Sequence, residues 1–183
     1  MYLKAGDKPD MEETLYLKPI TAGSPERELL DKMYAEAFPA NEWQPGCVKD
    51  ELNVSSQVWK AEEWLIMDGD TPVGPLSAIH TDKYAYLLYL AVSPRLQGKG
   101  YGSRVLALFK KLYPNHIRFF DLEVPDKSAG NAAQREARIR FYERNGYHLV
   151  DFEFEYHGVK LVVMTDSDEF ELTPEVMEIC VAE

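Results

Sequence analysis

Apolar residues follow two different spacings along this chain of 183 residues, and each spacing predicts a type of element. Short alternating or continuous apolar runs that end at turn residues are typical of strands. On this basis we expect strands at residues 15–20, 63–67, 73–80, 84–92, 117–124, 147–157 and 159–165. Asp68-Gly69-Asp70 and Gly158 are typical of the tight turns that join the strands of a hairpin.

Helical spacing appears in other segments. Val105, Leu108, Phe109 and Leu112 recur at i, i+3, i+4 and i+7, which predicts a helix over residues 102–112. End signals predict two further helices, one at 26–38 between Ser24-Pro25 and Pro39 and one at 134–145 before Gly146, and a short one from Pro174. Residues 39–57 are expected to hold loop and a short helix. The order of elements predicts an α+β fold with a mixed, mostly antiparallel sheet, since strands and helices do not alternate regularly.

The length and composition of the chain predict one packed domain. Its length and an apolar fraction of 45% suit a single domain, which we place at residues 1–165, with the acidic tail at 166–183 as part of the same unit. The longest apolar runs are too short to span a bilayer, and the polar first residues do not resemble a signal peptide. Two cysteines are too few for a disulfide framework or a metal site. We therefore expect a cytoplasmic protein without a metal.

Charge is distributed unevenly. The net charge is −11, and residues 166–183 hold seven acids and no Lys or Arg, which leaves −4 for the rest. Residues 93–118 hold six basic residues and no acid. A nucleic-acid surface usually needs a broader basic footprint, so this segment favours a local anionic ligand.

Three glycines at alternate positions lie in that basic segment, between a predicted strand and a predicted helix: Gly98, Gly100 and Gly102. Glycine allows positive φ and close approach of a ligand to the backbone. The first N–H groups of a helix have no internal partner and carry the positive end of its dipole. The segment therefore predicts a phosphate or pyrophosphate site. Its spacing fits neither a P-loop nor the dinucleotide fingerprint.

Two segments carry a resemblance to a known family. Gln97-Gly98-Lys99-Gly100-Tyr101-Gly102 resembles the Gln/Arg-x-x-Gly-x-Gly/Ala signature of the GNAT superfamily of acyl-CoA-dependent N-acyltransferases. RIRFYERNGY, residues 138–147, resembles that family's C-terminal FYxxxGF-type element, and the order of elements agrees over residues 15–165. The resemblance implies a GNAT-like sheet of about six or seven strands flanked by helices and splayed at the cofactor slot.

The resemblance also implies a cofactor, acetyl-CoA or another acyl-CoA, and the residues that hold it. The backbone of Leu90, Ala91 and Val92 would pair with the pantetheine arm as an added strand does. The N–H groups from Gln97 through Ser103 would hold the pyrophosphate. Many relatives have an Asn seven residues and an Ala four residues before the catalytic Tyr, where this chain has Arg135 and Arg138. Either the loop is longer and Asn131 still reaches the cofactor, or that contact is lost. Arg135 or Arg138 could meet a CoA phosphate instead.

Acyl transfer from a thioester to an amine needs a neutral amine, a stabilised oxyanion and a protonated thiol. By resemblance Tyr142 would donate the proton to the CoA thiolate, and a backbone N–H near Val92 would meet the oxyanion. An alkyl amine with a pKa near ~10 is mostly charged at neutral pH, so a base must assist. The candidates are Glu123 at the end of the strand at 117–124, Glu42 after the first helix, and His80.

The resulting hypothesis is an N-acetyltransferase that acts on a small-molecule or peptide amine, with no nucleic acid or membrane as partner and a homodimer left open. A non-catalytic acyl-CoA-binding or sensing module on the same fold is the alternative. A third hypothesis is an interaction domain that docks through its tail helix, where Val176, Ile179 and Cys180 share one face.

Overall fold

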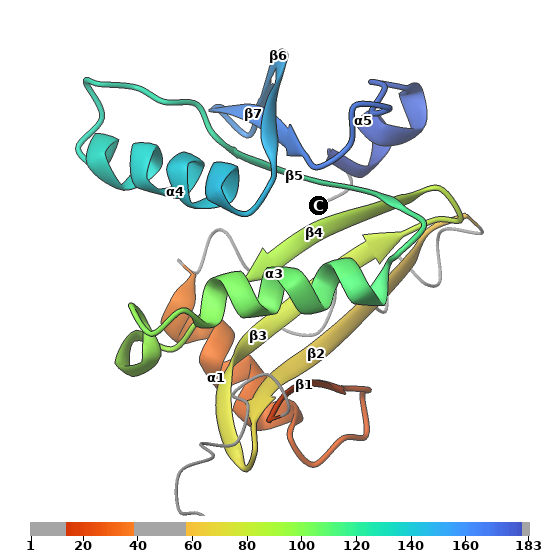
Figure 1. Cartoon of the computed structure of the whole chain (residues 1–183), viewed down its shortest axis with the longest axis vertical. Coiled ribbons are helices and arrows are strands. Elements are labelled where there is room, and N and C mark those ends of the chain that lie inside the picture. Colours follow the sequence, from red (N-terminus) through yellow and green to blue (C-terminus); the bar gives the residue numbers. More distant parts are fainter. Residues whose placement is uncertain (1–13, 39–57, 181–183) are drawn as a thin grey trace, which may run out of the picture.

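The computed structural model describes residues 14–38 and 58–180, which form one mixed sheet with helices on both faces (Figure 1). The strand order in the sheet is β1-β2-β3-β4-β5-β7-β6. The strands are β1 (Leu15–Pro19), β2 (Lys60–Asp68), β3 (Thr71–His80), β4 (Tyr84–Leu90), β5 (Ile117–Glu123), β6 (His148–Tyr156) and β7 (Val159–Thr165). The helices are α1 (Arg27–Ala37), α3 (Tyr101–Leu112), α4 (Ala132–Arg144) and α5 (Pro174–Cys180). The loop and short helix expected at 39–57 lie outside the described residues.

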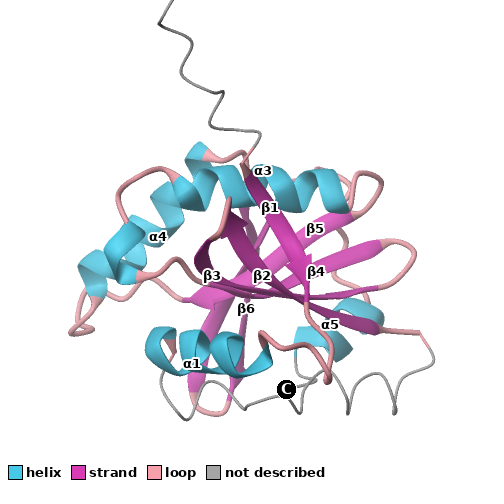
Figure 2. Cartoon of the chain, turned by 90° about the horizontal axis from the view of Figure 1, so that it is seen from below, coloured by secondary structure: helices cyan, strands magenta, loops and turns pink. Residues whose placement is uncertain are grey.

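Neighbouring strands are antiparallel except at one place, where β4 and β5 run parallel. The strand-to-strand crossover at that place contains α3. Helices α3 and α4 cover one face of the sheet, and α1 and α5 cover the other (Figure 2). The predicted α+β class, the number of strands and the mostly antiparallel sheet are therefore confirmed.

The main core forms where the sheet meets α3 and α5. Val105 and Phe109 of α3 are fully buried against it, as the helical spacing predicted. Val176, Ile179 and Cys180 of α5 belong to the same core. Thr173 starts this short helix, because its side-chain oxygen accepts a hydrogen bond from the N–H of Val176 over 3.2 Å.

Strands β4 and β5 separate after a short paired stretch. Over the described residues their pairing runs from Tyr84 opposite Ile117 to Tyr86 opposite Phe119, while both strands continue for four more residues. The sheet therefore opens between the carboxyl ends of two parallel strands. This is the splay that the family resemblance implied.

A β-bulge in β4 lies at the start of the opening. Ala78 of β3 pairs with Leu87, whereas the preceding residue, Ser77, pairs with Tyr89, so Leu88 is an extra residue on β4. A bulge bends its strand and increases the local twist. The bulge thus coincides with the point where β4 turns away from β5.

Candidate active site

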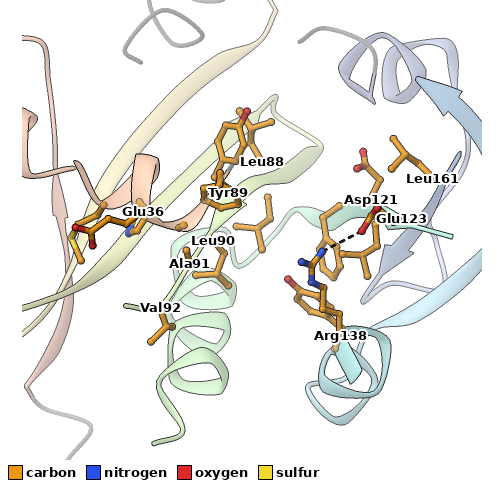
Figure 3. A pocket seen from close by; sticks show the side chains of 18 of the residues that line it. Glu36, Leu88, Tyr89, Leu90, Ala91, Val92, Asp121, Glu123, Arg138 and Leu161 are labelled. Atoms are coloured by element: carbon orange, nitrogen blue, oxygen red, sulfur yellow. Dashed lines mark ion pairs between the residues drawn. The ribbon is translucent and has the colours of Figure 1, made fainter. Parts of the chain in front are cut away.

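A cavity of about 760 Å³ occupies the opening between β4 and β5. Residues 87–92 form one wall and residues 120–123 the other, with α4, α1 and the β6–β7 turn around them. Figure 3 shows Leu88–Val92 facing Asp121 and Glu123 across this space, with Arg138 beside Glu123. The sheet therefore carries a cavity with an exposed strand edge on each side.

The backbone of β4 presents hydrogen-bonding groups to this cavity. The N–H of Ala91 donates to the carbonyl of Pro75 over 3.2 Å, and that of Ser93 donates to Val73 over 2.8 Å. Because N–H directions alternate along an extended chain, the N–H groups of Leu90 and Val92 point away from β3 and toward the cavity. They are available to an extended ligand that lies beside β4.

Gly74 allows the close approach of β3 to the end of β4. A Cβ at Gly74 would lie 1.9 Å from the carbonyl oxygen of Ala91. A separation this short excludes any larger side chain unless the backbone moves. Gly74 therefore fixes the position of the backbone that lines the cavity, and the sequence pattern did not single it out.

The glycine loop begins where β4 ends. The side chain of Gln97 donates to the carbonyl of Val92 over 3.1 Å and ties the loop to the strand. Gly98 and Gly100 have φ of 74° and 81°, and a Cβ at either would meet no atom within 4 Å. Both glycines are thus required by their backbone conformation, and the space beside them is open.

Helix α3 starts directly after Gly100 and points its free N–H groups at this space. The first hydrogen bond within the helix joins the N–H of Arg104 to the carbonyl of Gly100 over 3.3 Å. The N–H groups of Tyr101, Gly102 and Ser103 precede it, and the exposed Lys99 lies beside them. With the positive end of the helix dipole, these groups can bind a phosphate.

The side chains of the loop also hold the helix in place. The hydroxyl of Tyr101 donates to Asp68 over 2.6 Å. A hydrogen bond from Thr14, followed by that from Tyr101, lowers the pKa of Asp68 below its ordinary value. A Cβ at Gly102 would lie 2.9 Å from the ring of Phe141 on α4, so this glycine is required by helix packing. Sequence reasoning had assigned Tyr101 and Gly102 to the ligand alone.

Tyr142 lies on α4 and lines the cavity. Its ring packs on Phe120 with the ring centroids 4.2 Å apart. Burial raises the pKa of Tyr142 to about 12, and the positive charge of Arg138 opposes that rise. The phenol is therefore a protonated hydrogen-bond donor throughout the neutral range.

Glu123 lies in the cavity wall within a network of arginines. Arg135 donates to its Oε1 over 2.7 Å and Asn131 to its Oε2 over 3.3 Å, while Arg138 lies 3.9 Å from Oε2. Arg135 also donates to the side chain of Asn131 over 2.7 Å. The structure thus brings Glu123, Asn131 and Arg138 together, with both carboxylate oxygens already engaged.

The other two candidate bases have different positions. His80 is not among the residues that line the cavity; its Nε2 lies 3.2 Å from a carboxylate oxygen of Glu62, and its ring contacts Tyr113. It pairs with Ala85, before the strands separate. Glu42 lies outside the described residues. Among the described candidate bases, only Glu123 lies in the cavity.

Asp121 is a cavity residue that the sequence analysis did not single out. It lies on β5, and the hydroxyl of Tyr86 donates to its Oδ2 over 2.7 Å. Burial raises the pKa of Asp121 to about 6, and the hydrogen bond from Tyr86 opposes that rise. The available signal was an acid in the middle of the predicted strand, between the apolar residues Phe120 and Leu122. Buried carboxyl groups with raised pKa values are common in active sites.

A family comparison identifies the class of protein to which this site belongs. Residues 55–149, just over half of the chain, match the family described as "Acetyltransferase (GNAT) domain". The chain belongs to the GNAT acetyltransferase family. No curated protein sequence matches it.

Solved structures show the same GNAT fold. A protein described as a GNAT-family acetyltransferase from Bacteroides thetaiotaomicron is 20% identical, with a TM-score of 0.71 over 90% of this chain and 93% of that one. An acetyltransferase from Thermus thermophilus is 19% identical, with a TM-score of 0.57 over 83% and 96%. A dodecameric spermidine N-acetyltransferase from Vibrio cholerae is 15% identical, with a TM-score of 0.54 over 84% and 95%.

GNAT proteins take an acyl group from acyl-CoA, and the geometry of the cavity fits such a molecule. The outward N–H groups of β4 suit an extended amide-containing arm, and the glycine loop with the start of α3 suits a pyrophosphate. The described residues contain no group of three or more His, Cys, Asp or Glu side chains that could hold a metal ion. None of the described helices is both long and apolar enough to cross a membrane.

Proposed function

We propose that this GNAT protein transfers a short acyl group, acetyl in the first instance, from acyl-CoA to an amine by direct attack within a ternary complex. The observation that carries the proposal is the cavity between β4 and β5, which has free strand N–H groups on one wall and the phenol of Tyr142 on another. A thioester beside β4 would lie between a hydrogen-bond donor for its sulfur and an open approach for a nucleophile.

The acyl-CoA substrate would bind along β4 and the glycine loop. The backbone of Leu90, Ala91 and Val92 would pair with the pantetheine arm, and the N–H groups from Gln97 to Ser103 would hold the pyrophosphate. Arg138 is exposed at the edge of the cavity and lies 3.9 Å from Glu123, so its guanidinium can turn to a CoA phosphate. Asn131 is held by Arg135 and Glu123 and would support that position.

Tyr142 would assist the departure of the thiol. When the carbon–sulfur bond breaks, the sulfur gains negative charge, and a protonated phenol beside it stabilises that charge and supplies a proton. The N–H of Val92 would meet the oxyanion that forms on the carbonyl. This role requires Tyr142 to keep its proton at neutral pH, which its raised pKa ensures.

The charges around the cavity favour a cationic acceptor. Among the described residues that line it, Glu36, Asp121 and Glu123 carry carboxyl groups and Arg138 carries a guanidinium. An ammonium group is attracted to such a surface. Spermidine, the amine in the name of the Vibrio cholerae relative, is therefore a suitable first member of an amine panel. That relative is dodecameric, and a homodimer of this chain stays a prediction.

Thiol release with a panel of amines and acetyl-CoA tests the proposal. We expect turnover for the parent and a loss of about 100-fold in kcat for Tyr142→Phe, with acetyl-CoA binding retained. Tyr147→Phe is the matched control: Tyr147 packs on the same Phe120 ring, but it does not line the cavity. Its kcat is expected to stay within about threefold of the parent value.

Two outcomes would contradict the proposal. Acetyl-CoA binding without turnover of any amine would favour a sensing module instead of an enzyme. Equal losses in Tyr142→Phe and Tyr147→Phe would show that the effect comes from packing of the aromatic cluster and would remove Tyr142 from the mechanism.

A further inference from the structure

Two carboxyl groups on β5, Asp121 and Glu123, line the cavity but have different partners. Both oxygens of Glu123 accept hydrogen bonds from Arg135 or Asn131, and Arg138 lies near. The oxygens of Glu123 are therefore already engaged by protein donors and are less accessible to an incoming ammonium group. Asp121 instead accepts from the neutral phenol of Tyr86 through Oδ2, and no described cation forms an ion pair with it.

Asp121 lies on the opposite side of the sheet from Tyr142. Phe120 packs on Tyr142, on the face that α4 covers. Its neighbour Phe119 packs on Tyr86 and on Phe170, on the face that α5 covers. Successive side chains of a strand point to opposite faces, so Asp121 shares the face of Phe119. A thioester in the opening would thus have a donor on one side and a carboxylate on the other.

We propose that Asp121, held in place by Tyr86, is the group that takes the proton from the acceptor amine. The inference rests on the proposed function and names a catalytic residue for it. The α1 side of the cavity, with Tyr89 and Glu36, is then the side from which the amine enters (Figure 3). The donor and acceptor substrates would reach the opening from opposite faces of the sheet.

The proton and electron balance of this step is complete. The ammonium gives one proton to the Asp121 carboxylate, and the nitrogen lone pair then forms a bond to the thioester carbonyl carbon. The carbonyl electron pair moves to oxygen and returns as the carbon–sulfur bond breaks. The sulfur takes the proton of Tyr142, and the second nitrogen proton restores that phenol through water. Asp121 then releases its proton to solvent.

Other ionisable groups face the same cavity and have to be separated from Asp121. From α1 and β4 these are Glu36 and Tyr89. From β5 and α4 they are Glu123, Arg138 and Tyr142, and from the end of β6 and the turn after it they are Tyr156 and His157. The ordinary pKa of histidine, near ~6.5, falls in the range expected for Asp121. His157 is therefore the group that the experiment has to separate from Asp121.

The test is the pH dependence of kcat/KM for the parent and three variants, with acetyl-CoA and the best amine of the panel. The parent is expected to lose activity about tenfold per pH unit below pH ~6, because a protonated carboxyl group cannot accept the proton. Asp121→Asn is expected to lose at least about 100-fold at pH 7.5 and to lose this acidic limb. Tyr86→Phe is expected to move the limb to higher pH, since it removes the hydrogen bond that favours the charged form.

Two controls match these variants. Tyr84→Phe removes a phenol from the same strand and the same aromatic cluster, two residues before Tyr86, and is expected to keep the parent profile. His157→Asn, chosen because Asn tolerates the positive φ of 48° at this turn, is expected to keep the midpoint of the acidic limb. Binding of acetyl-CoA, measured as a thermal shift, is expected to be the same in Asp121→Asn and in the parent.

The possible results distinguish a failure of the Asp121 assignment from a failure of the proposed function. An active parent whose Asp121→Asn variant keeps both the rate and the acidic limb would overturn the role of Asp121 and leave the proposed function intact. Loss of the acidic limb of the pH profile in His157→Asn would also overturn the role of Asp121. A parent that binds acetyl-CoA but releases no thiol with any amine would contradict both. The carboxyl infrared band of Asp121, lost in Asp121→Asn, is expected to titrate near pH 6.

Discussion

At the residue scale, the site contains glycines whose role could be predicted from the sequence and a carboxyl group, Asp121, whose role could not. Gly98 and Gly100 could be assigned to a ligand loop because alternate glycines before a helix are uncommon and have a direct physical reason, a positive φ. Asp121 is one of two acids on β5, and its importance depends on β4, which brings Tyr86 to it from 35 residues away in the chain. Contacts between residues this far apart in the chain depend on strand pairing and cannot be predicted from a local sequence pattern.

The raised pKa of Asp121 predicts a cost in stability. The folded protein, with a pKa of about 6, binds the proton more tightly than the unfolded chain, whose Asp has a pKa near ~3.9. The free energy of unfolding therefore decreases as the pH rises from about 4 to 6 and stays lower above this range. Asp121→Asn is expected to be more stable than the parent at pH 7.5, by up to about 3 kcal/mol, and nearly equal to it near pH 4.

Urea unfolding at the two pH values measures this difference. The asparagine can still accept the hydrogen bond of Tyr86, so the change mainly removes a buried charge. An Asp121→Asn variant less stable than the parent at pH 7.5 would show that the ionised carboxyl group stabilises the fold and is not strained by burial.

At the element scale, the start of α3 serves both the fold and the proposed phosphate site. Gly100→Glu places a side chain at φ 81° and a negative charge beside the free N–H groups. We expect it to abolish the thermal shift with acetyl-CoA. Lys99→Ala, at an exposed position, is expected to weaken the shift without abolishing it. An unchanged shift in Gly100→Glu would move the phosphate site away from this loop.

Packing of α3 against α4 gives a separate prediction. Gly102→Ala is expected to destabilise the protein by about 1–3 kcal/mol, because its Cβ would lie 2.9 Å from the Phe141 ring. Phe141→Leu makes room, so the double variant is expected to lose less than the sum of the two single variants. Additive losses, measured by urea unfolding, would show that the two residues do not interact.

The same elements show what patterning could and could not predict. The helices and strands were expected within a few residues of their observed ends, because apolar spacing or Pro and Gly end signals mark them in the sequence. Strand β2 is longer than expected, Lys60–Asp68 in place of 63–67, since its register with β3 extends from His80 to Thr71. The bulge at Leu88 was not expected, because the apolar run that contains it shows no change in sequence pattern at that position.

At the scale of the whole molecule, the acidic tail contributes to the fold. The side chain of Asp166 is buried and pairs with Arg118 over 2.7 Å and with Lys110 over 3.3 Å. The apolar face of α5 packs in the core of its own sheet, so it is not an open docking face. Ile179→Ala is expected to destabilise the protein by about 2–4 kcal/mol, because Ile179 is only 1% exposed. A loss below about 0.5 kcal/mol in urea unfolding would contradict this role of the helix.

The central claim is that the opening between β4 and β5 joins an acyl-CoA to an amine. Incubation of the parent with isotopically labelled acetyl-CoA and a pool of amines that includes spermidine, followed by mass spectrometry, tests it most directly. We expect labelled acetyl groups on at least one amine, and loss of that product in both Gly100→Glu and Tyr142→Phe. Binding of acetyl-CoA without any labelled product would contradict the claim, and so would a product that both variants form at the parent rate.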